Sequence, residues 1–153
     1  MSETAQSPPA PQRLSGLEQL RAALGEGAEP KGIGHTVGFR MVELQEGRVV
    51  FEGVPGRHVY NPIGTVHGGY AATLLDSAVG CAVHSRLGPD QGYTTLELKV
   101  AYHRAMTEDT GPVRAEGRVV SLGRRTGFAE GRITDASGRL YATATSTLLV
   151  FER

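Results

Sequence analysis

The segment HGGYAATLLDSAVGCAVHSRL, residues 67–87, decides the fold because it is the one long helical pattern in the chain. It is rich in alanine and leucine and contains no proline. Gly88 and Pro89 follow it, and this pair ends helices. We therefore predict a helix over His67–Leu87, with strands on either side of it.

The sequence around this helix alternates between apolar and polar residues, as β-strands do. Two strands are predicted before it, and the turn Gln45-Glu46-Gly47 joins them as a hairpin. The predicted strands are His35–Leu44, Arg48–Val54, Tyr93–Arg104, Val113–Leu122, Thr126–Thr134 and Leu140–Phe151. Short connections make the sheet antiparallel. One helix covers so wide a sheet only if the sheet curls around it, which predicts an α+β fold with a central, mostly buried helix.

The first 30 residues have a different character. Residues 1–13 are rich in Pro, Ala, Ser and Gln, which is typical of a disordered tail. Leucines at helical spacing predict a short amphipathic helix over Leu14–Leu24, lying as a lid on the main body, with a linker to residue 30. Residues 31–153 are predicted to form a single domain.

Composition excludes several classes of function. The 16 basic and 16 acidic residues leave no basic surface for nucleic acid, and no apolar run is long enough to span a membrane. The single cysteine favours a reducing compartment, and we expect a cytoplasmic protein. The five histidines lack metal-ligand spacing, and neither a Gly-x-Ser-x-Gly nor a phosphate-binding Gly-x-x-x-x-Gly-Lys motif is present. We expect neither a metal nor a bound cofactor.

A stripe of small and polar residues runs along the predicted helix. Steps of three and four residues connect Gly69, Thr73, Asp76, Gly80 and His84. A carboxylate flanked by glycines suggests a groove that admits a ligand or a neighbouring backbone. The alternative is an Asp76 side chain that is exposed or paired with an arginine.

The start of the helix is the second chemical feature. The first amide groups after His67 have no partner within the helix and lie at the positive end of its dipole. Such an end favours an anion or a developing oxyanion, and Gly68 and Gly69 let a carbonyl approach the backbone. The alternative is a tight turn with no further role.

Residues 61–76, NPIGTVHGGYAATLLD, resemble the signature of the hotdog-fold thioesterases, in particular the PaaI-like branch related to 4-hydroxybenzoyl-CoA thioesterases. That branch has Asn or Gln six residues before His-Gly-Gly and an acidic residue seven after the second glycine, as Asn61 and Asp76 do here. The resemblance covers about residues 35–151. It implies hydrolysis of a small aromatic or medium-chain acyl-CoA by a homo-oligomer, most simply a dimer of dimers, with active sites between protomers.

The resemblance also implies residue roles. Asp76 would be the nucleophile or the general base, and the Gly68 amide would polarise the thioester carbonyl. Asn61 would position the carbonyl or the attacking water, and His67 would shape the helix start. Thr94 matches a catalytic Ser or Thr of some relatives.

Alternation supports the choice of Thr94. It shares a strand face with Leu96 and Leu98, which we expect to point toward the helix, whereas Thr95 would point away. The sequence departs from some aromatic acyl-CoA relatives at Gly80, where they carry a water-holding threonine.

Coenzyme A adds several phosphate charges to such a substrate. The predicted phosphate site is the turn Gly123-Arg124-Arg125, with His103 and Arg104 beside it and Gly69 at the helix start. The alternative is a solvated turn. Two other functions remain open at this point, namely a non-catalytic acyl-CoA-binding protein and an enoyl-CoA hydratase or dehydratase.

Overall fold

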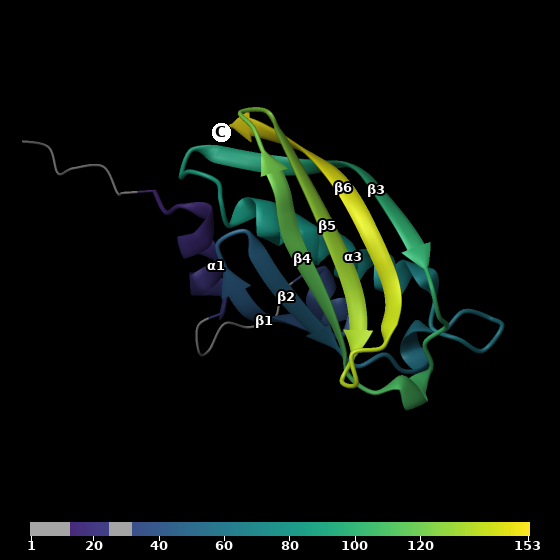
Figure 1. Cartoon of the computed structure of the whole chain (residues 1–153). Coiled ribbons are helices and arrows are strands. Elements are labelled where there is room, and N and C mark those ends of the chain that lie inside the picture. Colours follow the sequence, from purple (N-terminus) through teal and green to yellow (C-terminus); the bar gives the residue numbers. More distant parts are fainter. Residues whose placement is uncertain (1–12, 25–31) are drawn as a thin grey trace, which may run out of the picture.

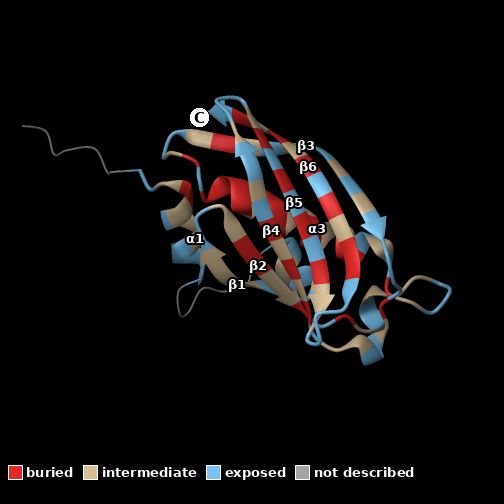
Figure 2. Ribbon diagram, in the orientation of Figure 1, coloured by how far each residue is buried: buried red, intermediate tan, exposed pale blue. Residues whose placement is uncertain are grey.

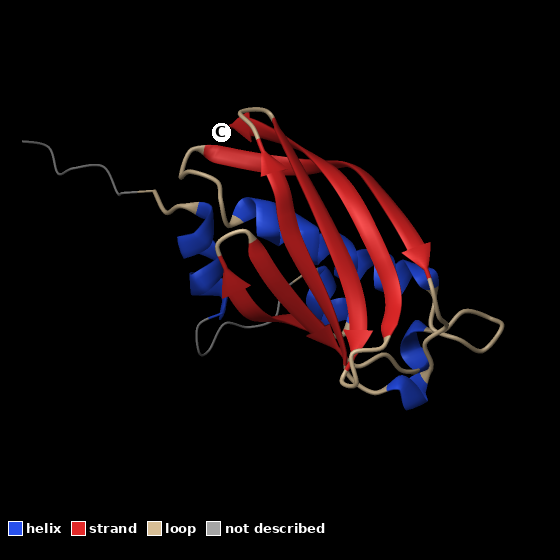
Figure 3. Ribbon diagram, viewed as in Figure 1, coloured by secondary structure: helices blue, strands red, loops and turns tan. Residues whose placement is uncertain are grey.

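The computed structural model describes residues 13–24 and 32–153 and has one long helix packed on a curled sheet (Figure 1). The strands are β1 (Phe39–Gln45), β2 (Arg48–Gly53), β3 (Gln91–Tyr102), β4 (Val113–Leu122), β5 (Thr126–Asp135) and β6 (Leu140–Glu152). The helices are α1 (Gly16–Leu24), α2 (Ile33–Val37) and α3 (Gly68–His84), with short 3-10 turns η1 (Arg57–Val59) and η2 (Glu108–Thr110). All neighbouring strands pair antiparallel, in the order β1-β2-β4-β5-β6-β3. The predicted fold class is confirmed (Figure 3).

The sheet faces α3 with alternate residues of its central strands. On β4 the buried residues are Val113, Ala115 and Gly117, as the alternation predicted, and the intervening residues are less buried (Figure 2). The closest approach is at Gly117, where a Cβ atom would lie 2.3 Å from the backbone of Ala78. Glycine is therefore what lets β4 and the middle of α3 touch.

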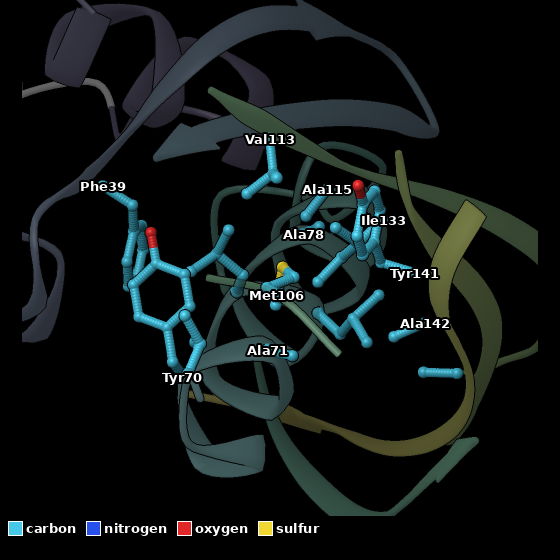
Figure 4. Packing of buried hydrophobic residues seen from close by; sticks show 14 residues of the cluster. Phe39, Tyr70, Ala71, Ala78, Met106, Val113, Ala115, Ile133, Tyr141 and Ala142 are labelled. Atoms are coloured by element: carbon cyan, nitrogen blue, oxygen red, sulfur yellow. The ribbon is translucent and has the colours of Figure 1, made fainter. Parts of the chain in front are cut away.

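The core fills the space between α3 and the sheet. Leu74, Leu75 and Ala78 of α3 are inaccessible to solvent and pack against Val113 and Ile133 of the sheet. Tyr70 and Phe39 lie at one end of this cluster (Figure 4). This packing holds one side of α3 firmly and leaves the side that carries Asp76 only half-buried.

The first predicted strand begins too early. Residues 33–37, including His35, form the short helix α2, and β1 starts only at Phe39. The reason is Gly38, which ends α2 with a left-handed backbone (φ 78°) that L-residues avoid. The other strands match their predicted bounds within about two residues.

The N-terminal helix lies against the main body, as predicted. The amide of Gly16 donates to the carbonyl of Leu87, just beyond the end of α3 (3.0 Å). The predicted tail (residues 1–13, apart from Arg13) and the linker (25–30) lie outside the described residues. Within the described part, no helix is long and apolar enough to cross a membrane.

Candidate active site

The carboxylate of Asp76 lies at the middle of α3, on the side of the helix that the core does not cover. It is half-buried, and its Oδ1 accepts a hydrogen bond of 3.0 Å from the hydroxyl of Thr95 on β3. Neither of the alternatives considered for it, an exposed side chain or one paired with arginine, describes this position. Asp76 is therefore a carboxylate held in a fixed direction by a neighbouring strand.

The predicted orientation of Thr94 and Thr95 is wrong. Thr95 points to α3 and Thr94 is exposed, because β3 has a bulge between Thr95 and Glu97. The bulge inserts Leu96 as an extra residue, so the alternation on one side of it is out of phase with that on the other. As a result Leu96 is 58% exposed rather than facing the helix. The hydrogen bond to Asp76 is the observation that identifies Thr95 as the threonine facing α3.

A groove of about 1030 Å³ opens beside Asp76, between α3 and β3 on one side and α1, α2 and β1 on the other. We call it the Asp76 groove. Its apolar lining includes Leu20, Leu24, Met41 and Phe51. The polar lining on the α3 and β3 side consists of Asp76, Ser77, Cys81, Tyr93, Thr94 and Thr95, and His35 and Arg40 line the other side. The groove therefore combines one carboxylate with a mostly apolar enclosure, which is the usual composition of a small-molecule site.

Tyr93 occupies the space above Gly80, where the sequence suggested room for a ligand or a backbone. A Cβ on Gly80 would lie 2.8 Å from the Tyr93 hydroxyl, so the glycine accommodates this ring. Burial raises the pKa of Tyr93, and it raises the pKa of the Cys81 thiol to about 12. Both groups are therefore neutral at physiological pH. They shape the groove as hydrogen-bonding but uncharged side chains.

His67 shapes the start of α3, as predicted. Its Nδ1 accepts a hydrogen bond of 2.8 Å from the amide of Gly69, so His67 is the N-cap of the helix. The Gly69 amide is thus already used, which is at odds with its predicted contact to coenzyme A. Among the described residues the Gly68 amide has no acceptor, and the Gly68 carbonyl accepts from the hydroxyl of Tyr102 (2.9 Å). Gly68 is the amide left available for a ligand.

Asn61 organises the loop before α3. Its Oδ1 accepts from the amides of Ile63 (3.1 Å) and Thr65 (3.3 Å), and its Nδ2 donates to the Thr65 hydroxyl (2.9 Å). These bonds give Asn61 a structural task in this chain, in addition to the substrate contact that the resemblance implies.

The two predicted catalytic elements do not meet within one chain. Eight residues of helix separate Gly68 from Asp76, which corresponds to about 12 Å at 1.5 Å per residue. One thioester carbonyl cannot contact both in a single copy. One chain therefore does not bring both predicted elements to the same carbonyl.

The predicted phosphate-binding residues also fall into two groups. The Arg125 carbonyl accepts from the Val150 amide, and Val150 pairs with Tyr93 near the start of β3. His103 follows the far end of β3, about 30 Å along the strand from Tyr93, and its ring bonds to the Thr143 hydroxyl (2.8 Å). The turn 123–125 and the pair His103–Arg104 thus lie at opposite ends of the sheet and do not form one cluster within a single chain.

A second hollow, of about 510 Å³, lies over the sheet strands and contains no residue of α3. Some of its charged side chains pair with one another, as Glu116 does with Arg118 (2.8 Å) and Arg132 (3.5 Å). In the described ranges, no group of three His, Cys, Asp or Glu side chains is arranged to hold a metal ion. Of these two hollows, the Asp76 groove is the one that contains the carboxylate predicted to be catalytic.

Comparison with known proteins settles the family. The Thioesterase superfamily model matches residues 63–142, more than half of the chain. The chain belongs to this superfamily. The matched segment includes α3 with Asp76, as well as Thr95.

Individual relatives agree with this assignment. A 1,4-dihydroxy-2-naphthoyl-CoA hydrolase of Listeria monocytogenes is 28% identical over 119 residues, covering 78% of this thioesterase and 95% of the relative. A conserved protein from Pseudomonas aeruginosa has a similar structure (TM-score 0.74, 31% identity, 80% of this chain and 95% of that one). A mutant of the phenylacetic acid degradation protein PaaI from Thermus thermophilus is also similar in structure. Its TM-score is 0.69 and its identity 27%, and the match covers 76% of this chain and 96% of that one. The predicted hotdog family and the predicted class, a thioester hydrolase, are confirmed.

Proposed function

We propose that this thioesterase hydrolyses the thioester bond of an acyl-CoA, with Asp76 as its catalytic carboxylate. The observation that carries the proposal is the position of Asp76, half-buried in an apolar groove and oriented by the Thr95 hydroxyl. The CoA in the name of the Listeria relative supports this substrate class. The acyl group is a small aromatic or medium-chain group.

A carboxylate in this position serves thioester hydrolysis in one of two ways. It attacks the carbonyl carbon and forms a mixed anhydride, with CoA thiolate as leaving group, or it removes a proton from an attacking water. The Thr95 bond leaves the second oxygen of Asp76 free for either task. Turnover in the presence of hydroxylamine distinguishes them, because only the anhydride route can convert the Asp76 side chain itself into a hydroxamate, which mass spectrometry of the protein detects.

The negative charge that develops on the carbonyl oxygen needs a donor, and we propose the Gly68 amide of a second copy. The 12 Å between Gly68 and Asp76 excludes the same chain as the source. The amide lies at the positive end of α3, where such a donor is worth about 3 kcal/mol in the transition state. A homodimer in which each α3 start meets the partner's Asp76 groove completes two equivalent sites.

We place the phosphates of coenzyme A at Arg124 and Arg125. Both side chains are exposed, and within the described residues neither has an acidic partner within 4.0 Å. Their turn is two strand spacings from Tyr93, about 10 Å from the rim of the groove. In such a dimer His103 and Arg104 would approach the substrate from the partner's side.

The direct test is release of free thiol from a panel of acyl-CoAs by the wild-type protein and by Asp76→Asn. Asn preserves the shape of the side chain but neither attacks nor accepts a proton, so kcat falls at least about 100-fold. Asp90→Asn is the matched control, because the Asp90 side chain is exposed and, among the described residues, pairs with Arg13 at the surface. Near-normal turnover by Asp76→Asn would contradict the proposal.

A mixing experiment tests the shared site. Asp76→Asn lacks the carboxylate and Gly68→Pro lacks the amide, so each variant alone is expected to be inactive. If each site takes Asp76 from one copy and Gly68 from the other, mixed dimers contain one intact site and activity returns after subunit exchange. A mixture that stays inactive, although mixed dimers are detected by mass spectrometry, would show that the site is not shared in this way.

A further inference from the structure

The helix α1 is attached to the main body through its backbone rather than through a large side chain. The Gly16 amide donates to the Leu87 carbonyl (3.0 Å), and a Cβ on Gly16 would lie only 1.8 Å from the His84 carbonyl oxygen. Ser15 and Glu18 define the start of the helix, because Glu18 Oε2 accepts from the Ser15 amide (2.8 Å) and hydroxyl (2.7 Å). The position of α1 against the end of α3 is therefore specified at this one end.

The other end of α1 projects apolar side chains into the Asp76 groove instead of into the core. Leu20, Ala23 and Leu24 all contribute to the lining of the groove, and Leu24 remains 39% exposed. Apolar side chains that line an open groove gain free energy when an apolar ligand removes them from water. On the opposite wall lie Asp76 and Thr95, so a group joined to a carbonyl at Asp76 extends toward α1.

We propose that α1 is the wall that limits the size of the acyl group, with Ala23 and Leu20 as the residues that determine specificity. This inference rests on the proposed acyl-CoA hydrolysis. The volume of the groove, about 1030 Å³, is at the upper end of the roughly 300–1,000 Å³ of drug-sized ligand sites. The substrate class is therefore an acyl-CoA with a bulky apolar acyl group, either a ring or a chain of medium length, rather than acetyl-CoA.

The polar groups near Asp76 limit this class further. Tyr93 and Cys81 are neutral and Thr95 is already bonded to Asp76, so this wall offers no charged partner except the catalytic carboxylate itself. An acyl group with a second carboxylate would face Asp76 without compensation. Arg40 lines the opposite side of the groove, so the preference for an uncharged acyl group applies next to Asp76.

Two neighbouring alanines of α1 provide a matched test. Ala23 lines the groove, whereas Ala22 is exposed but does not, so Ala22→Trp adds the same indole ring to the same helix outside the groove. The readout is the ratio of kcat/KM for phenylacetyl-CoA or octanoyl-CoA to that for acetyl-CoA. Ala23→Trp is expected to lower this ratio at least about tenfold, and Ala22→Trp to leave it within about twofold, in the range by which apolar pockets discriminate.

Leu20→Ala is expected to shift the acyl-chain preference in the opposite direction. It enlarges the same wall, so the preferred chain in a series from butanoyl- to dodecanoyl-CoA shifts to a longer one. Opposite shifts from Ala23→Trp and Leu20→Ala do not arise from general destabilisation, which would lower all rates together. Melting temperatures of all three variants confirm that they are folded.

The outcomes separate this inference from the function on which it rests. If the wild-type protein releases thiol from none of the acyl-CoAs, the proposed function fails, and the inference fails with it. If the wild-type protein is active but Ala23→Trp and Ala22→Trp have the same selectivity, or Leu20→Ala leaves the preferred chain length unchanged, α1 is not the wall of the acyl pocket. The hydrolytic assignment then stands without it.

Discussion

The hydroxyl of Thr95 donates to Asp76 Oδ1 at 3.0 Å, and this bond fixes the direction of the carboxylate in the groove. It joins α3 to β3 across the side of the helix that the core leaves uncovered. One carboxylate oxygen is thereby oriented and the other faces the groove. The bond predicts a positioning role for Thr95 in the proposed hydrolysis.

Thr95→Val removes this hydroxyl and keeps the branched shape of the side chain. A hydrogen bond to a charged group contributes about 1.5 kcal/mol, so kcat is expected to fall about tenfold. Thr94→Val is the comparison, because Thr94 also lines the groove but is exposed and is not the threonine that bonds to Asp76, so kcat should change by less than about twofold. Equal losses in the two variants, or a loss only in Thr94→Val, would restore the role that the sequence suggested for Thr94.

The comparison of Thr94 with Thr95 shows how far the sequence alone can lead. The long helix and the six antiparallel strands follow from periodicity and turn residues, which are local properties. The bulge at Leu96 is not marked by any glycine or proline, so the alternation extrapolated from one side of it placed the wrong threonine against Asp76. A single inserted residue reversed the assignment of the face.

Features that depend on tertiary packing were even harder to predict from the sequence. The sequence contains Arg124 and His103, but which end of the sheet each occupies depends on strand order and direction. The ring of Tyr93 over Gly80 and the groove-lining residues of α1 are contacts between segments far apart in the chain. The resemblance implied the residues of the site, and the structure adds that Gly68 and Asp76 are about 12 Å apart along α3 of one chain.

Replacing Gly117 is expected to lower the stability of the fold strongly. In Gly117→Ala the new Cβ would lie 2.3 Å from the backbone of Ala78, and neither element can move aside without separating α3 from β4. We expect a loss of about 3 kcal/mol or more in the free energy of unfolding, measured by urea denaturation. In Gly123→Ala, where the nearest atom lies 3.6 Å away, the change should stay within about 1 kcal/mol. A stable Gly117→Ala protein would contradict this account of the helix–sheet contact.

Tyr70 carries a hydroxyl that is buried and has no hydrogen-bond partner in the described structure. Its removal in Tyr70→Phe leaves the ring in place beside Phe39 and is expected to leave the free energy of unfolding unchanged or raise it by up to about 1 kcal/mol. Tyr141→Phe is the contrasting variant, because the Tyr141 hydroxyl donates to Asp135 Oδ2 (3.1 Å). Its melting temperature should fall. A marked loss of stability in Tyr70→Phe would instead reveal a partner for its hydroxyl.

His84 predicts how stability changes with pH. Burial lowers the pKa of its imidazole below the ordinary value of 6.5, and the positive charge of Arg153 lowers it further. Between the lowered pKa and pH 6.5 the unfolded chain binds a proton that the folded chain does not, so acidification favours unfolding in this range. This contribution to stability is fully present above about pH 6.5 and is lost as the pH falls through the lowered pKa.

The carboxylates affect stability in a separate, more acidic pH range. The Ser137 hydroxyl, as a hydrogen-bond donor, lowers the pKa of Asp135 to about 2, so its contribution is lost between about pH 4 and pH 2. Melting temperatures measured from pH 8 to pH 5 should therefore report His84 with little interference from Asp135. His84→Phe keeps a ring next to Tyr93 and cannot be protonated, so its melting temperature should decline less between pH 6.5 and pH 5 than that of the wild-type protein. Both proteins should lose stability alike below pH 4, and parallel curves over the whole range would show that His84 does not govern the first decline.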